Sequence, residues 1–545
     1  MIILKVSSNA IFGGAFFMIK RILICGIAMM VLSCVLYTHL LSISLNEDYA
    51  GAGEEQFYYN IDISTSFGSI YDCKFNPLVN DTTKNIAVVN PTDEAISEVS
   101  KYVLDTSELE EKISIGMPFA IEVSTDSFNS KDISNYVVPN RYSSNQLAKH
   151  TIGYTVDNVG VSGLELSYND FLHQSEQTYS VKLAKDGLGN VLQGIEPIVS
   201  SIDTIKSGIV TTIDKDIQSI CEYSMRNVDM GACIVTEVST GEIKAMVSMP
   251  SFDIDNLAIS LNDNSMPFIN RNLCAYSCGS IFKLITSGVA LEYGINEDFS
   301  VECTGSLNVF NQKFNCHNLN GHGVQSMRTA MKNSCNTYFI ELSQYLPNDA
   351  LLEVCDRLGF GRETIFAKNI VSQSGYLPTE NQLNVPAEKA NFSFGQGYLT
   401  VTPIQISSLT CAIANDGVMP ILYLVKGKTT DGYTIYDTNE PKYTPVFSID
   451  TAKKLQDFMN YSVQYNSASK GRPYNNTAGG KTSTAQTGRY NPDGSEVCQA
   501  WITGYFPCLN PKYAVTVLVE NGDYGNNSCA PIFKQIIELI TEDNL

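Results

Sequence analysis

The chain is organised around residues 276–294, which read Tyr276-Ser-Cys-Gly-Ser-Ile-Phe-Lys-Leu-Ile-Thr-Ser-Gly-Val-Ala-Leu-Glu-Tyr-Gly294. From Ser280 onward the apolar residues recur at a spacing close to 3.6, which predicts a buried helix that ends at Gly294. Gly279 permits a tight turn into this helix, so Ser280 falls in its first turn. Lys283 follows three residues later and therefore lies on the same face.

Ser280 and Lys283 form a candidate nucleophile and its base. Desolvation lowers the pKa of a lysine among apolar neighbours, and a neutral amine beside a hydroxyl can activate a serine. Free backbone N–H groups at the start of the helix could stabilise an oxyanion. The structural alternative is that Ser280 caps the helix while Lys283 extends to solvent. A second Ser-x-x-Lys, residues 467–470, lies in a polar stretch without an apolar run, so we assign it no role.

Two further motifs offer groups that would complete a site around this pair. In Ser334-Cys-Asn336 the hydroxyl could relay a proton, and the amide could bind a substrate carbonyl. The stretch 479–485, Gly-Gly-Lys-Thr-Ser-Thr-Ala, predicts a strand that carries Lys481 and Thr482, a cation and a hydroxyl suited to a carboxylate. Its partial similarity to a phosphate-binding loop is rejected, because the first glycine is missing at the required spacing.

Composition excludes several classes of function. The 545 residues predict about two to four domains, and the net charge of −21 excludes a nucleic-acid-binding face, which would be basic. There are five histidines and fifteen cysteines, but no Cys-x-x-Cys pair, so zinc knuckles and thioredoxin-like motifs are unsupported. Cys303 and Cys316 flank a hairpin-like stretch and are the predicted disulfide pair.

The N-terminal segment predicts a membrane anchor. Residues 22–45 are uncharged and mostly apolar, and as a helix they span roughly 36 Å, enough to cross a bilayer. Two basic residues precede the segment and two acidic residues follow it, so residues 1–21 are expected in the cytoplasm and the rest outside the cell membrane. The alternative is a secretory signal cleaved near 50–52, but the apolar stretch is long for one. Met18 is a natural start for such an anchor.

The remaining sequence predicts two domains. Residues 46–204 are polar and mixed, with short strand-like runs at 85–89 and 119–123, and are expected to form a spacer or docking domain. Residues 205–545 contain an early hairpin, helices in the middle, and a late hairpin followed by a terminal helix. An antiparallel sheet flanked by helices and completed by both ends of the domain is an α+β fold. The expected elements are a helix that begins near Asp214, strands at 232–238 and 243–247, helices at 351–360 and 404–414, strands at 500–505 and 513–520, and a helix at 532–540.

The three motifs in this order resemble those of penicillin-binding transpeptidases and serine β-lactamases. Ser334 follows Ser280 by 54 residues and precedes Lys481 by 147. Other stretches along the chain look like landmarks of the class B (monofunctional) penicillin-binding proteins. These stretches are Gly68-Ser-Ile-Tyr-Asp72, Arg141-Tyr142, Gly163-Leu-Glu165, Asn270-Arg271, Gly321-His-Gly323, Gly395-Gln-Gly397, Thr402-Pro403, Ala500-Trp501 and Ala530-Pro-Ile-Phe533.

The resemblance implies a peptidoglycan D,D-transpeptidase with a pedestal domain at 46–204 and a transpeptidase domain at 205–545. In that family Ser280 would attack the D-Ala-D-Ala carbonyl of a stem peptide, with Lys283 as base. Ser334 would relay the proton to the leaving D-Ala, and Asn336 would bind the peptide. An amine of a neighbouring stem would then accept the acyl group, and β-lactams would acylate the same serine.

The family pattern also implies how the substrate is held. Lys481 and Thr482 would bind the terminal carboxylate, and the N–H groups of Ser280 and Thr484 would form the oxyanion hole, so Thr484 joins the predicted binding residues. No metal or organic cofactor is implied. The expected partners are the membrane and proteins of the elongation or division machinery.

Three positions depart from the family pattern. Cys278 replaces a usual proline, Ser483 replaces a usual glycine, and Phe67 replaces a usual arginine in the pedestal. None of these removes a catalytic group. A β-lactamase has the same motifs but rarely an anchor and a pedestal, and an inactive scaffold would not need all the catalytic residues.

Overall fold

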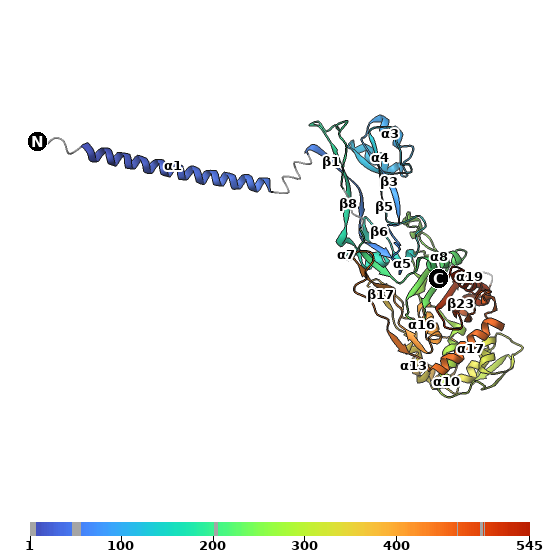
Figure 1. The fold of residues 1–545 in the computed structure, drawn as a ribbon. Coiled ribbons are helices and arrows are strands. Elements are labelled where there is room, and N and C mark those ends of the chain that lie inside the picture. The colour runs from blue at the N-terminus through green and yellow to red at the C-terminus, as the bar shows by residue number, and fades with distance from the viewer. Residues whose placement is uncertain (1–6, 46–55, 201–204, 466, 491–493, 495) are drawn as a thin grey trace. The chain divides into compact units, whose positions relative to one another are not determined.

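The structure is a computed structural model, and it describes residues 7–45, 56–200, 205–465, 467–490, 494 and 496–545 (Figure 1). By packing, the chain divides into two units. The first comprises Met1–Thr65, Lys84–Val138 and Thr178–Ile202, and the second comprises Ser66–Thr83, Pro139–Gln177 and Asp203–Leu545. Each unit is a set of residues that pack together, and each is built from several separate stretches of the chain. The predicted domains at 46–204 and 205–545 are continuous stretches, so their boundary stays a prediction.

The N-terminal helix α1 spans Ser7–Ser44. Its part Phe17–Ser44 is long and apolar enough to cross a membrane, with a mean hydropathy of 2.2 in its most apolar window and no burial inside the protein. This stretch contains most of the predicted anchor at 22–45.

The first unit contains two three-stranded sheets. In one, β8 lies between β1 and β9, and in the other, β3 lies between β4 and β5. The strand-like runs predicted at 85–89 and 119–123 are confirmed as parts of β3 and β4. Helices α3 and α4 accompany the second sheet. The bounds are β1 Tyr58–Ser66, β3 Thr82–Val89, β4 Phe119–Val123, β5 Ile133–Asn140, β8 Gln177–Ala184, β9 Ile198–Val199, α3 Asp93–Val99 and α4 Thr106–Ile115.

A five-stranded antiparallel sheet forms the centre of the second unit, and the predicted α+β fold is confirmed. Its strand order is β12-β11-β24-β23-β22, so both predicted hairpins lie side by side and β22 is an edge. Alternate side chains enter two different cores, because successive residues of a strand point to opposite faces. Ala232 and Ile234 belong to one core, and Cys233 and Val235 to the other. The bounds are β11 Gly231–Glu237, β12 Ile243–Met249, β22 Gly479–Tyr490, β23 Glu496–Phe506 and β24 Tyr513–Glu520.

Helices cover both faces of this sheet (Figure 1). Helices α8 and α19 pack on one face, and α16 and α17 pack on the other. The predicted cap of α8 is confirmed, because the Asp214 carboxylate accepts hydrogen bonds from the N–H groups of Asp216 and Ile217. The helix predicted at 351–360 is α13, which begins and ends three residues earlier. The bounds are α8 Lys215–Met225, α13 Asn348–Arg357, α16 Pro403–Ala414, α17 Ile449–Tyr465 and α19 Ala530–Glu542.

The segment predicted as one helix from Ser280 begins differently. A 3-10 turn, η3, spans Gly279–Phe282, and the α-helix α10 follows at Lys283–Glu292. Gly279 has a φ of 52°, and its N–H donates to the Gly395 carbonyl at 3.0 Å. The left-handed glycine turns the chain sharply into the tighter 3-10 helix. The turn leads directly into α10, so the expectation that Ser280 and Lys283 lie on adjacent turns of one face still holds.

A second, smaller sheet within the same unit joins three distant segments. Strand β10 (Gly208–Thr211) pairs in parallel with β2 (Ser69–Tyr71) and antiparallel with β20 (Val425–Thr429). Ile70 and Ile209 of this sheet are completely buried in the large core.

An arginine joins the pedestal landmarks that the sequence places far apart. Arg141 forms a two-pronged ion pair with the buried Glu165, at 2.9 and 2.7 Å, and donates to the Gly68 carbonyl at 2.7 Å. Phe67, which replaces the family's usual arginine, lies flat beneath the guanidinium at 4.1 Å and stacks on His173 at 4.2 Å. The departure at Phe67 therefore replaces a charge with a cation–π contact.

Strand β22 packs closely against the η3 turn. Ser483 is 3 % exposed, and within the described residues its hydroxyl has no hydrogen-bond partner. A Cβ at Gly279 would lie 2.5 Å from this hydroxyl oxygen, so the two segments have no spare room between them. Because the two segments approach so closely, small residues are favoured at both positions. The unpaired Ser483 hydroxyl slightly destabilises the fold.

We expect substitutions at Ser483 to change the melting temperature in a defined order. Ser483→Ala removes an unpaired hydroxyl and should stabilise the unit by about 1 kcal/mol. Ser483→Gly should gain less, because glycine in a strand costs about 0.5–1 kcal/mol. Ser483→Leu should destabilise by about 1–3 kcal/mol through overpacking. Thermal melts of the detergent-solubilised chain test this order, and a lower melting temperature for Ser483→Ala would contradict it.

Candidate active site

The Lys283 amine lies at the centre of the site and is completely buried. Its Nζ is 2.9 Å from Ser280 Oγ, 2.7 Å from the Ser334 carbonyl oxygen and 2.7 Å from Asn336 Oδ1. The Ser334 hydroxyl lies slightly farther away, at 3.2 Å. One amine therefore joins the η3 turn to the Ser334–Asn336 segment.

Burial determines the protonation state of this amine. Desolvation lowers the pKa of Lys283 to about 7 from the usual value near 10.5. A neutral amine has two N–H groups and one lone pair. The carbonyl oxygens of Ser334 and Asn336 can only accept, so they use both N–H groups and leave the lone pair for the Ser280 hydroxyl proton. This is the arrangement that a serine nucleophile needs.

A second buried lysine approaches the same hydroxyl from the sheet. Lys481 on β22 is completely buried, and its Nζ lies 3.1 Å from Ser334 Oγ and 2.7 Å from the Thr482 carbonyl oxygen. Burial, and then the charge of Lys283, hold the pKa of Lys481 well below its ordinary value. The Ser334 hydroxyl thus bridges two amines and can pass a proton between them and a substrate.

Local backbone geometry positions Ser334 and Asn336. Ser334 closes helix α11 (Met327–Asn333) in a left-handed conformation with φ 52°, and Asn336 opens helix α12 (Asn336–Ser343). A left-handed serine costs about 1–2 kcal/mol, and such strain concentrates at functional sites. The strained residue turns both its carbonyl and its hydroxyl toward Lys283.

Thr482 and Thr484 lie on the opposite side of β22 from Lys481 and Ser483. The Thr482 hydroxyl donates to the Ser467 carbonyl at 2.6 Å, and the Thr484 hydroxyl accepts from the Gly525 N–H at 3.1 Å. Thr484 consequently keeps its own hydroxyl hydrogen for an acceptor such as a carboxylate. The second Ser-x-x-Lys offers only the Ser467 backbone carbonyl to these groups, and its exposed Lys470 pairs with the side chain of Asn527.

Side chains from distant parts of the sequence fix the approach to Ser280, and two of them, Gln499 and Glu520, were not singled out by the sequence. The Ser277 N–H donates to the Gln499 side chain, and the Ser277 carbonyl accepts from Trp501 Nε1 at 3.0 Å. Behind them, Glu520 accepts from both Arg271 and Tyr276, each at 2.8 Å. Gln499 and Glu520 are partners on the neighbouring strands β23 and β24, far from Ser277 in the sequence, so no local pattern could have identified them.

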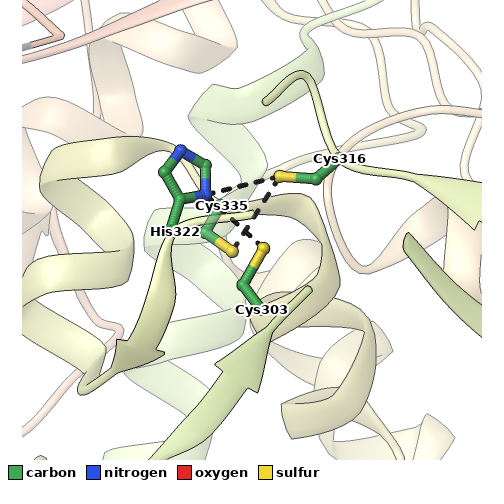
Figure 2. Close-up of side chains that lie close together, drawn as sticks. All are labelled: Cys303, Cys316, His322 and Cys335. Carbon is green, nitrogen blue, oxygen red and sulfur yellow. Dashed lines mark hydrogen bonds between the residues drawn. The ribbon is translucent and has the colours of Figure 1, made fainter. Parts of the chain in front are cut away.

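A compact group of sulfur and imidazole ligands lies beside the Ser334–Asn336 segment (Figure 2). It contains Cys303, Cys316, His322 and Cys335, whose ligand atoms all lie within 4.8 Å of one another. Cys303 and Cys316 were predicted as a disulfide, but both are free thiols. The sequence analysis did not identify the cluster, because its spacing contains no Cys-x-x-Cys pair. Three cysteines and a histidine within 33 residues could nevertheless have indicated a group of metal ligands.

Comparisons with known proteins agree with this geometry. Residues 231–538 match the family described as the penicillin-binding protein transpeptidase domain. The chain is 27% identical to stage V sporulation protein D of Bacillus subtilis over 84% of this chain and 72% of that protein. It is 28% identical to peptidoglycan D,D-transpeptidase PbpA of Mycolicibacterium smegmatis, over 68% of this chain and 76% of that protein.

The fold is likewise similar to a solved structure titled as the structural coordination of polymerization and crosslinking by a peptidoglycan synthase complex. The TM-score is 0.69 with 22% identity, over 95% of this chain and 97% of the other. The family match covers more than half of the 545 residues, and the Ser280–Lys283–Ser334 arrangement lies inside it. The chain therefore belongs to the penicillin-binding protein transpeptidase family, as a class B member.

Proposed function

We propose that this protein is a peptidoglycan D,D-transpeptidase that cross-links stem peptides through a serine acyl-enzyme. The observation that carries the proposal is the buried Lys283 amine, 2.9 Å from the Ser280 hydroxyl and with both of its N–H groups committed elsewhere. The names of the curated relatives support the substrate class.

The first half of the reaction forms an ester. Ser280 Oγ attacks the carbonyl between the two D-alanines of the donor stem, and its proton passes to the Lys283 lone pair. The tetrahedral oxyanion is held by the N–H groups of Ser280 and Thr484. The C–N bond then breaks, and the proton moves through Ser334 to the amine of the leaving D-Ala.

The second half reverses these steps with a different amine. The amine of a neighbouring stem attacks the ester, loses a proton through the same groups and forms the cross-link, and Ser280 is released as the hydroxyl. Asn336 would bind the donor peptide, and Lys481 with Thr484 would hold its terminal carboxylate, which Thr482 would join by turning its hydroxyl away from the Ser467 carbonyl. β-Lactams would acylate Ser280 in the same way, as the family's description implies.

We also propose a location and a class of partner. Residues 22–44 of the apolar helix at Phe17–Ser44 would anchor the protein, with the first 21 residues in the cytoplasm and the catalytic unit outside. Proteins of the division or elongation machinery are the proposed partners, supported by the similarity to a chain from a synthase complex.

We expect Ser280→Ala to abolish covalent labelling by a fluorescent penicillin, because it removes the attacking oxygen. Lys283→Arg should fail as well, since a guanidinium stays protonated and cannot act as a base. Ser287→Ala is the matched control: this serine lies farther along, buried on α10, and its hydroxyl contacts none of the catalytic groups, so labelling should persist. Gel fluorescence and intact mass measure the adduct.

The lifetime of the label separates transpeptidase from hydrolase. The proposed transpeptidase should keep its penicilloyl adduct for many minutes. Rapid turnover of a chromogenic cephalosporin would instead identify a β-lactamase, and a penicilloyl adduct on Ser280→Ala would refute the assigned nucleophile.

The acylation rate should depend on pH through the Lys283 amine. The base must be neutral, and its pKa is lowered to about 7, so the second-order rate constant should rise as pH increases through about 7 and then level off. Because two lysines share the Ser334 hydroxyl, the midpoint belongs to the pair. Stopped-flow acylation from about pH 5.5 to 9 measures it, and a rate independent of pH over that range would contradict a neutral lysine base.

Orientation in the membrane can be tested with a reporter. Alkaline phosphatase joined after residue 545 should be active, because this enzyme folds only outside the cytoplasm, whereas the same reporter joined after residue 21 should be inactive. Replacing both Lys20 and Arg21 by glutamate should reduce the C-terminal activity by removing the positive flank. Equal activity at both positions would contradict the proposed topology.

A further inference from the structure

Three separate parts of the second unit bring the four ligands of the cysteine–histidine cluster together (Figure 2). Cys303 ends strand β13 (Val301–Cys303), and Cys316 directly follows β15 (Gln312–Asn315). His322 directly precedes β16 (Gly323–Gln325), which pairs with β13, and Cys335 lies between α11 and α12. Their side chains point toward a common centre.

The distances within the cluster fit a tetrahedral metal ion. His322 Nδ1 lies 3.6 Å from the sulfurs of Cys303 and Cys316, and the sulfurs of Cys316 and Cys335 are 4.0 Å apart. Zinc binds thiolate sulfur at about 2.3 Å and imidazole nitrogen at about 2.0–2.1 Å, which places neighbouring ligand atoms of a tetrahedron roughly 3.5–3.8 Å apart. The spacing therefore corresponds to ligands around one small ion.

Burial and charge also favour a metal. The three cysteines are at most 2 % exposed, and His322 is half-buried. Three thiols and one imidazole are the ligand set of a closed structural zinc site, and soft thiolates favour zinc over magnesium or calcium. A single disulfide could use only two of the three sulfurs and would leave the third thiol and the imidazole without a role.

We propose that Cys303, Cys316, His322 and Cys335 bind one Zn²⁺ ion, which fixes the segment that carries Ser334 and Asn336. Each ligating thiol loses its proton to solvent on binding, and no electron transfer is involved. The ion would link Cys335 to the β13–β16 pair, so that the left-handed Ser334 is held from both sides.

Cys335 connects the metal to the catalytic groups. It is the residue between Ser334 and Asn336, and its N–H donates to the Ala330 carbonyl at 2.9 Å. Both neighbours contact Lys283, so a shift of this backbone by a fraction of an ångström would misplace the amine's acceptors. The four ligands are thus positioning residues, and this part of the inference rests on the proposed transpeptidase function.

The first test is the metal content of the full chain, purified in detergent without chelators. We expect one equivalent of zinc by elemental mass spectrometry. Replacement by Co²⁺ should give the thiolate-to-cobalt charge-transfer absorption of a sulfur-rich tetrahedral site. Neither measurement depends on enzymatic activity.

Matched variants then locate the site. His322→Gln should weaken zinc binding by about tenfold or more, whereas His317→Gln should retain the metal, although His317 Nδ1 lies only 4.0 Å from Cys316 Sγ. Cys303→Ser should also lose zinc, and Cys498→Ser, which removes a thiol outside the cluster, should not. Melting curves of all four variants show whether each is folded.

The second test asks whether the ion positions the catalytic segment. Penicillin acylation of Cys303→Ser should fall by about 10–100-fold and should not recover when zinc is added, while Cys498→Ser should acylate like the wild type. A wild-type chain stripped by a chelator should lose acylation and regain it when zinc returns. Unchanged acylation in the stripped, folded chain would overturn the positioning role.

The outcomes that overturn the metal site are distinct from failure of the proposed function. A metal-free wild-type chain with four free ligands, or a mass lower by two hydrogens with a disulfide among Cys303, Cys316 and Cys335, would exclude the zinc site. A chain that binds one zinc but is not acylated by penicillin would leave the metal site intact and refute the transpeptidase proposal instead.

Discussion

A buried amine that must satisfy three oxygen atoms is the constraint on which this protein depends. Lys283 Nζ contacts Ser280, Ser334 and Asn336 at 2.7–2.9 Å, and the side chain is completely buried. A charged lysine would be costly there, so the fold itself favours the neutral base. The catalytic property is thus a consequence of packing.

The same constraint explains why strain is tolerated next to it. Ser334 adopts an unfavourable left-handed conformation, and its carbonyl and hydroxyl are thereby directed at two lysines. The cost is offset by the core in which the flanking helices α11 and α12 lie, where Met331 and Phe339 are completely buried. One member of the cysteine–histidine cluster, Cys335, directly follows this residue, so the proposed metal ion would restrain it further.

The sequence predicted the central sheet and its flanking helices, and it singled out Ser280, Ser334 and Asn336, which contact Lys283, and Lys481, which contacts Ser334. It succeeded because apolar periodicity and spaced motifs report directly on helices, hairpins and catalytic groups. It missed the 3-10 turn at Gly279, since the periodicity of one turn cannot distinguish 3-10 from α geometry. It paired Cys303 with Cys316, because the approach of His322 and Cys335 depends on the pairing of β13 with β16 and on the α11–α12 turn, which no local pattern encodes.

The small sheet of β2, β10 and β20 limits how the protein can be divided. A fragment cut to begin at residue 205 would contain β10 and β20 but not β2, whose Ile70 is completely buried in the catalytic unit's core. Strand β10 would become a bare edge with unpaired backbone groups, beside the cavity left by the missing isoleucine. Such an excised catalytic domain would be prone to association through that edge, so the shortest fragment that preserves the native core must begin no later than Ser66.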